Sequence, residues 1–199
     1  MKVNILSDIH GNTHYLDRLA RKTDDLIIQI GDFGFANDWK VLSNYSPAKV
    51  KVVGGNHDEY PIVNQYPHYL GDYGLIPGFD MKVGFLRGAY SIDRYCRIEG
   101  ISWWPEEQIS YPDLWKFLDW YEIEKPDVMI THCSTITGLH RCVHPVFSYS
   151  RTETVLEEAF KIHPPKIHVH GHLHVSKKYD VGKTKCICLN VHESREFDW

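Results

Sequence analysis

The chain has 199 residues, of which 43% are hydrophobic and 24% are charged, the composition of an ordinary globular domain. Its formal net charge of −4 gives no general attraction to nucleic acid, so any polyanion would have to be held locally. No stretch approaches 18 consecutive apolar residues, which excludes an ordinary membrane-spanning helix.

The N-terminus runs directly into the first polar motif and leaves no room for a signal peptide, so we expect a cytoplasmic protein. The length fits one domain over residues 1–199. The five cysteines are odd in number and scattered, which argues against a disulfide framework. Cys186 and Cys188 alternate within an apolar run, so we expect them to face one side of a strand rather than to form a metal pair.

Short apolar runs at residues 2–6, 26–30 and 50–53 predict three strands, each ending at a polar or glycine-containing turn. Asn12 or Thr13 can cap a helix between the first two strands, where apolar residues recur at helical spacing. Strand-type runs separated by a helical pattern predict a parallel α/β sheet.

The middle of the chain is rich in Gly, Pro and Tyr from residue 61 to 88, which predicts loop with one strand at 81–86. Ser110 with Asp113, and Ser150 with Glu153, form capping patterns that begin two helices. Four further strands are predicted at 128–131, 167–169, 175–181 and 184–191.

Metal-ligating residue types gather in four short clusters and one isolated histidine. These are Asp8-Ile9-His10, Gly31-Asp32, Gly55-Asn56-His57-Asp58, His132 and Gly171-His172-Leu173-His174. The first three clusters follow predicted strands closely, and open α/β sheets build their sites at the carboxyl ends of strands. Carboxylate, imidazole and amide ligands in this number can hold two divalent cations, which points to phosphoester hydrolysis.

Individual residues suggest individual roles. Asp32 is the candidate bridge, because a carboxylate has two oxygens and can bind two cations. Asn56 supplies a neutral oxygen, which keeps the site from becoming too negative to accept a phosphate. His57 follows immediately, and adjacent residues at a turn commonly point apart, so we expect His57 to face the substrate.

Taken in order, these motifs resemble those of the calcineurin-like metallophosphoesterase superfamily, and they extend from Asp8 to His174. The resemblance implies a four-layer αββα sandwich of two mixed β-sheets. It implies two divalent ions and hydrolysis by a hydroxide that bridges them, with His57 as the acid that protonates the leaving oxygen. The implied ligands are Asp8, His10, Asp32 and His174 for one ion, and Asp32, Asn56, His132 and His172 for the other.

Departures from the pattern narrow the expected branch. The phosphoprotein-phosphatase branch normally continues from its Gly-Asp with an Asp and an Arg that orient the catalytic His and bind phosphate. Here Phe33-Gly34-Phe35-Ala36 follows Asp32, so both roles are vacant. The chain is more similar to bacterial and phage phosphodiesterase-type members, which predicts a preference for small diesters.

Other functions stay open. The main alternative is a phosphomonoesterase acting on phosphoprotein or a nucleotide monophosphate; a nuclease is less favoured because of the acidic charge. A non-catalytic scaffold is least favoured, because every implied ligand and His57 are present. Because the implied ligand set contains no cysteine, Mn²⁺ is the expected metal, with Fe, Ni²⁺, Zn²⁺ or Mg²⁺ as alternatives. The sequence does not indicate the oligomeric state.

Substrate recognition is expected in residues 87–108, where arginines alternate with large aromatic residues. Arg87 is the first candidate for a phosphate contact, because its neighbour Gly88 would allow a ligand to approach closely. The alternative is that these arginines form ion pairs beside core tryptophans, in which case the pocket would be sought between Cys133 and Tyr149.

Overall fold

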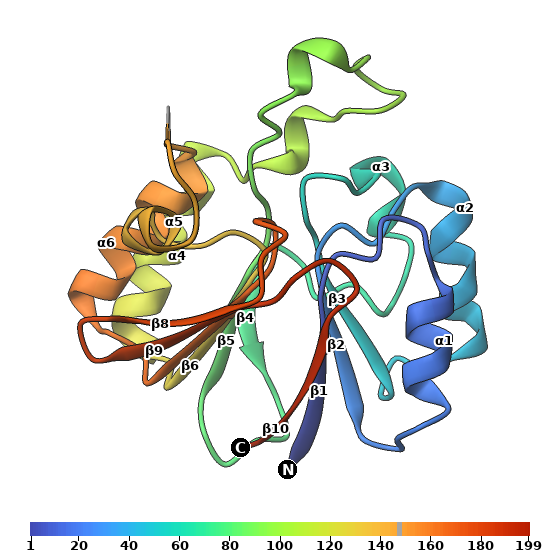
Figure 1. The fold of residues 1–199 in the computed structure, drawn as a ribbon, viewed down its shortest axis with the longest axis horizontal. Helices are drawn as coiled ribbons and strands as arrows, with labels where there is room; N and C mark the ends of the chain where they lie inside the picture. Colours follow the sequence, from blue (N-terminus) through green and yellow to red (C-terminus); the bar gives the residue numbers. More distant parts are fainter. Residues whose placement is uncertain (147–148) are drawn as a thin grey trace.

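Two β-sheets pack face to face at the centre of the molecule, and helices cover the outer face of each (Figure 1). The computed structural model describes residues 1–146 and 149–199. The strand order is β10-β1-β2-β3 in the first sheet and β4-β5-β6-β7-β9-β8 in the second. This arrangement confirms the predicted four-layer αββα sandwich of two mixed sheets.

In the first sheet, three strands are parallel and the fourth is antiparallel at one edge. Strands β1 (Lys2–Leu6), β2 (Leu26–Ile30) and β3 (Val50–Val53) are parallel, and β10 (Ser194–Asp198) pairs antiparallel with β1. Side chains alternate between the faces of this sheet, so one set packs on the second sheet and the other on the helices. The covering helices are α1 (His14–Ala20), α2 (Ala36–Trp39), the 3₁₀ helix η1 (Lys40–Asn44) and α3 (Tyr60–Val63).

In the second sheet, four parallel strands form the centre and an antiparallel strand pairs at each edge. The parallel strands are β5 (Val83–Leu86), β6 (Val128–Thr131), β7 (Ile167–His170) and β9 (Thr184–Cys188). The edge strands are β4 (Tyr73–Ile76) and β8 (Lys177–Val181). On the outer side lie α4 (Tyr111–Glu124), α5 (Ile136–Cys142) and α6 (Arg151–Ile162), and α4 and α6 begin at the predicted serine caps Ser110 and Ser150.

The functional motifs meet because of the strand directions. The carboxyl ends of β1, β2, β3, β6 and β7 lie at the same end of the sandwich, opposite the two chain termini (Figure 1). Beyond β5, residues 87–108 leave the sandwich at this end and include the short 3₁₀ helices η2 (Arg94–Cys96) and η3 (Pro105–Glu107). The motifs and residues 87–108 therefore share one end of the fold.

Several elements differ from the sequence-based prediction. Strand β8 begins at Lys177 rather than at residue 175, and β9 ends at Cys188 rather than at 191. Neither β10 nor β4 was predicted. The β10 segment Ser-Arg-Glu-Phe-Asp has one apolar residue, and β4 contains a glycine, so both lack the apolar run on which the prediction relied. Both are edge strands, whose order comes from pairing with an inner neighbour.

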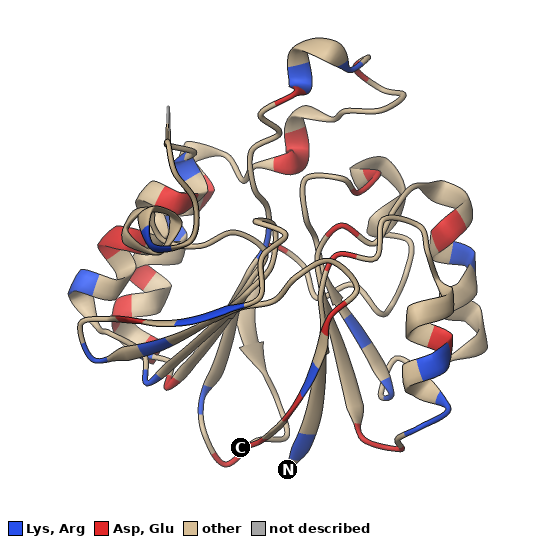
Figure 2. Ribbon diagram, in the orientation of Figure 1, with Lys and Arg blue, Asp and Glu red and all other residues tan. Residues whose placement is uncertain are grey.

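Positively and negatively charged residues are interspersed along the two helix layers and the strand ends (Figure 2). Among the residues that the structure describes, no helix has the length and apolar character needed to cross a membrane.

Candidate metal centre

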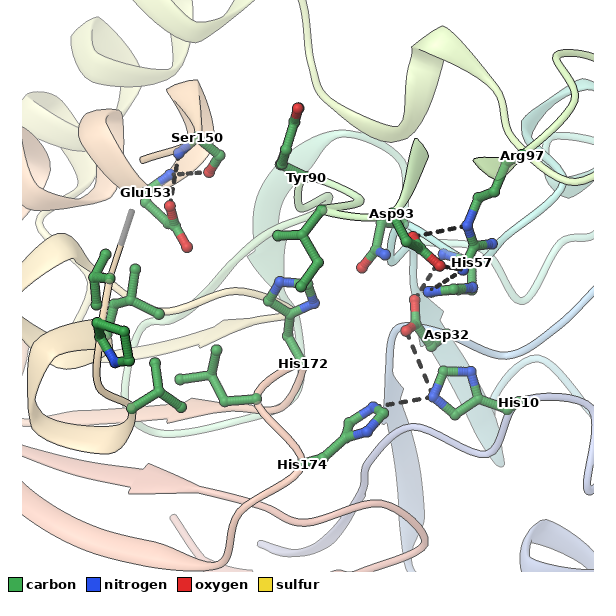
Figure 3. Close-up of a pocket in the computed structure, with 17 residues that line it drawn as sticks. His10, Asp32, His57, Tyr90, Asp93, Arg97, Ser150, Glu153, His172 and His174 are labelled. Atoms are coloured by element: carbon green, nitrogen blue, oxygen red, sulfur yellow. Dashed lines mark hydrogen bonds and ion pairs between the residues drawn. The ribbon is translucent and has the colours of Figure 1, made fainter. Parts of the chain in front are cut away.

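The predicted metal ligands gather at the carboxyl ends of the strands and form two overlapping groups. Figure 3 shows four of them, His10, Asp32, His172 and His174. Within each group, one ligand atom from every residue lies within 4.8 Å of the others. The groups are Asp8, His10, Asp32 and His174, and Asp32, His132 and His172. Only Asp32 belongs to both, which is the geometry that a bridging carboxylate requires.

The two carboxylate oxygens of Asp32 face different groups. Oδ1 lies 3.1 Å from His132 Nε2, and Oδ2 lies 3.7 Å from His10 Nε2. Asn56, which holds no ionisable group, completes the second group, because its Oδ1 lies 3.0 Å from His132 Nε2. In the first group, His174 Nε2 lies 3.6 Å from Asp8 Oδ1. Each oxygen of Asp32 is therefore positioned to serve one ion.

Hydrogen bonds outside the two groups fix which ligand atoms face inward. His132 Nδ1 lies 2.8 Å from the Ile30 carbonyl oxygen, to which it donates, so its Nε2 is left with a lone pair for an ion. The Asn56 side-chain nitrogen donates to Ser91 Oγ at 3.0 Å, which turns the Asn56 oxygen toward the site. Such orienting partners are characteristic of metal sites.

The backbone at the ligands is held in an uncommon conformation. His10, Asp32, His172 and His174 have φ angles of 45°, 55°, 66° and 53°. Non-glycine residues with positive φ cost of order 1–3 kcal/mol each where the conformation is strained, and they concentrate at functional sites. At Gly55, an added β-carbon would lie 2.3 Å from Asp32 Oδ1 and 2.9 Å from His132 Nε2, so glycine is needed there for close approach.

The electrostatics of the site favour positive charge. Burial alone would raise the pKa of Asp32, but the charge and hydrogen bond of His132 hold it well below its usual range. Burial would lower the pKa of His132, but the adjacent carboxylate raises it to about 10. A proton on His132 thus occupies the place that a cation would take, and metal binding would release it. The donor set and its buried negative charge fit divalent ions.

Asp58, left without a role by the sequence, organises the turns around the site. Its carboxylate accepts backbone N–H bonds from Gly55 at 2.7 Å, Gly34 at 3.0 Å and Asp32 at 3.2 Å. Since these residues belong to the turns after β2 and β3, Asp58 joins the two turns that carry Asp32 and Asn56.

His57 lies beside the two groups and contacts a guanidinium that the sequence analysis missed. Arg97 Nη2 lies 3.1 Å from His57 Nε2, and because a guanidinium only donates, that nitrogen accepts. Arg97 is held in turn by a two-point ion pair with Asp93, with both N–O distances 2.8 Å (Figure 3). Burial lowers the pKa of His57.

Arg97 thus contacts the predicted catalytic histidine, and Asp93 holds Arg97 in place. The sequence analysis found no Asp and Arg directly after Asp32; this Asp–Arg pair comes from a different segment of the chain. The signal was the i, i+4 spacing of Asp93 and Arg97 inside the expected recognition segment 87–108. That spacing did not show which arginine would reach the site.

Arg87, the predicted phosphate contact, lies elsewhere. Its Nε donates to Asp72 Oδ1 and its Nη1 to the Glu106 carbonyl oxygen, each at 2.5 Å, and its guanidinium stacks over Tyr60 at 4.4 Å. Arg87 is buried and does not line the cleft described next; its donors instead bond residues at the base of the 87–108 segment, so a phosphate contact by Arg87 stays a prediction that this position does not favour. The alternative interpretation of Arg87 as part of an ion pair describes it better.

A cleft of about 860 Å³ opens over the two ligand groups. One side is polar and contains His57, Asp93 and Arg97 (Figure 3). The opposite side is largely apolar, but Ser150 and Glu153 also line it (Figure 3). Its apolar part comes from α5 and the residues after it, within the alternative segment 133–149, of which 147 and 148 lie outside the described residues. Its apolar lining residues are Leu139, Val143, Pro145, Val146 and Leu173.

Three further histidines, His140, His168 and His170, lie outside the cleft. His168 and His170 are buried in β7, where they contact Thr131 and Tyr179 respectively. His140 is exposed and hydrogen-bonds to the Tyr149 hydroxyl at 2.7 Å, and it does not line the cleft.

The sandwich and its paired Asp/His groups define a phosphoesterase of the metal-dependent class. The chain belongs to the calcineurin-like phosphoesterase family, whose model matches residues 1–176. This membership makes the chain a metal-dependent phosphoester hydrolase, and it agrees with the Asp/His groups that could hold divalent ions.

Solved structures show the same fold at low sequence identity. A phosphatase with two metals from Danio rerio matches with a TM-score of 0.59 and 10% identity, over 96% of this chain and 88% of its own. An archaeal phosphodiesterase matches with a TM-score of 0.50 and 14% identity, over 99% of both chains. No curated protein matches the chain.

A third structure is that of a protein from Staphylococcus aureus with a provisional 5′-nucleotidase assignment. It matches with a TM-score of 0.55 and 14% identity over 98% of this chain. The present chain spans half the length of that protein. The likeness therefore concerns the fold alone.

Because Asp32 belongs to both ligand groups, we expect Asp32→Ala to lower the metal content at both. The measurement is metal per chain by mass spectrometry after removal of loosely bound ions. Asp180→Ala, at an exposed position of β8, is the control and should keep the wild-type content. Retention of two tightly bound ions in Asp32→Ala would refute the bridging assignment.

Substitution of Arg97 should affect catalysis, whereas substitution of Arg87 should affect stability. Arg97→Ala is expected to lower kcat/KM, with a loss of transition-state stabilisation of about 1.5–3 kcal/mol, the range for a hydrogen bond to a charged group. The metal content should be unchanged. Arg87→Ala should instead lower the melting temperature, because it breaks the ion pair with Asp72, and leave kcat/KM of the folded protein close to wild type. A kinetic loss confined to Arg87→Ala would restore the original assignment of the phosphate contact.

Proposed function

We propose that the chain hydrolyses small phosphodiesters at a centre of two divalent ions. The observation that carries this proposal is the single carboxylate, Asp32, shared by two ligand groups at the floor of a cleft. The proposed ligands are Asp8, His10, Asp32 and His174 for one ion, and Asp32, Asn56, His132 and His172 for the other. When bound, the ions would supply positive charge for the phosphoryl oxygens and activate a water molecule as the nucleophile.

The residues of the chain would bind, orient and protonate the substrate. The Nη2 of Arg97 now donates a hydrogen bond to His57 Nε2, with the two nitrogens 3.1 Å apart. A phosphate oxygen of the substrate would replace His57 as the acceptor of this bond. His57 would then be free to hold a proton on Nε2 and give it to the leaving oxygen, as a general acid. Asp93 would keep the guanidinium of Arg97 in place through its two hydrogen bonds.

The charge and shape of the cleft favour a diester over a monoester. Of the described residues that line it, Arg97 is the only Lys or Arg, and its charge is already paired with Asp93. A monoester dianion would find little further cationic side-chain charge here. A diester carries one negative charge and a second substituent, and the apolar wall of Leu139, Val143 and Leu173 offers that substituent a surface.

The proposed metal is Mn²⁺, because the two groups offer only nitrogen and oxygen donors. The cleft volume of about 860 Å³ is that of a site for a small molecule. A nuclease is less favoured, since the charges around the fold are mixed in sign (Figure 2).

We expect a higher kcat/KM for a diester than for the matching monoester with the same leaving group. The measurement is a panel of mono-, di- and cyclic phosphoesters assayed with Mn²⁺, with Asp32→Ala as the control for contaminating activity. A clear preference for the monoester would overturn the diester proposal and favour the phosphomonoesterase alternative.

His57→Ala should lower kcat by about 10²–10⁴-fold for a diester with an alkyl leaving group, the range for loss of a general acid. The loss should be smaller for a nitrophenolate leaving group, which needs little protonation. Metal content should stay near that of the wild type. An equal loss for good and poor leaving groups would contradict the acid role.

A further inference from the structure

A third group of metal-ligating side chains lies outside the cleft. Cys142, His170 and Cys188 each offer one ligand atom, and these three atoms lie within 4.8 Å of one another. The residues come from the end of α5, the end of β7 and the end of β9. His170 and Cys188 are buried, and Cys142 is partly buried. The arrangement brings together three elements that are distant in sequence.

We propose that Cys142, His170 and Cys188 bind one zinc ion that fastens α5 to the second sheet. This site shares no ligand with the two groups around Asp32 and differs from them in having sulfur donors. Two thiolates and an imidazole are preferred ligands of Zn²⁺. A tetrahedral Zn²⁺ with bonds of about 2.0–2.3 Å keeps its ligand atoms roughly 3.3–3.8 Å apart, so the three ligand atoms, now within 4.8 Å of one another, would move together on binding.

The surroundings prepare His170 to be a ligand. Its Nδ1 lies 3.1 Å from the Gly171 carbonyl oxygen, to which it donates, so Nε2 keeps a lone pair. That lone pair now accepts the Tyr179 hydroxyl at 2.7 Å and would turn to the ion. Tyr179 lies close enough to serve as the fourth ligand or to hold a water molecule there.

The two cysteines are also prepared. A hydrogen bond with Cys188, supported by His170, lowers the pKa of Cys142 to about 5. The same hydrogen bond and burial raise the pKa of Cys188. Metals bind the thiolate, so an ion at this group would displace the thiol protons of both cysteines. All five cysteines are free, so no disulfide competes in this structure.

The position of the site links it to the cleft. Residues of α5 and those directly after it, including Leu139 and Val143, form part of the apolar wall. A zinc ion held by Cys142 would fix the end of this helix against β7, whose next residues carry the ligand His172. The proposed ion would thus hold in place the wall that we assign to the second ester substituent, although its binding does not depend on that assignment.

The test is metal content together with cobalt spectroscopy of the full chain, purified with a reductant. Cys142→Ser and Cys188→Ser should each bind one zinc ion fewer per chain than the wild type. Cys96→Ser, at an exposed cysteine outside the group, is the matched control and should lose none. Circular dichroism checks that each variant is folded.

Cobalt gives a readout that does not depend on the phosphoesterase centre. Co²⁺ bound at the proposed site should produce thiolate-to-metal charge-transfer absorption, because only this group contains cysteine. The band should disappear in Cys142→Ser and persist in Asp32→Ala. The proposal is overturned if the wild type shows no such band, or if mass spectrometry finds a Cys142–Cys188 disulfide in the reductant-treated protein.

Discussion

The burial of two aspartates beside one another is the constraint on which the rest of the site depends. Asp8 and Asp32 are almost fully buried, and two like charges in a low-dielectric interior repel unless cations lie between them. The four histidines of the two groups lie beside these carboxylates, and Asp32 raises the pKa of His132 to about 10, which favours positive charge there. Without compensating positive charge, this edge of the sandwich would be strongly unfavourable.

The fold stabilises that arrangement by using both sheets. Asp8 and Asp32 follow strands of the first sheet, whereas His132 and His172 follow strands of the second. The apolar core between the sheets therefore sets the distance between the two halves of the site. The packing of the sheets stabilises an otherwise unfavourable left-handed backbone conformation at four ligands, and this conformation directs their side chains toward the site.

Residues 87–108 add the groups that the sandwich itself lacks. Ser91 orients Asn56, and Arg97, held by Asp93, contacts His57. Residues 87–108 therefore contact both a proposed metal ligand and the proposed acid. Arg87 stays at the base of this segment, paired with Asp72. The proposed metal ligands would thus come from the strand ends, and residues 87–108 would contribute to substrate binding. The sulfur-containing group includes Cys142 at the end of α5, the helix that contributes Leu139 to the apolar wall of the cleft.

The sequence by itself determined the inner strands, the capped helices and the residues of the two Asp/His groups. These features are encoded locally, by apolar runs, capping pairs and ligand types at strand ends. Only the tertiary structure decided which arginine reaches His57. Arg87 and Arg97 lie in the same segment of the sequence, and the path of the backbone places Arg87 beside Asp72 and Arg97 beside His57. The same holds for the edge strands β4 and β10 and for the meeting of Cys142 with Cys188, since contacts between distant segments depend on packing and pairing that no local pattern records.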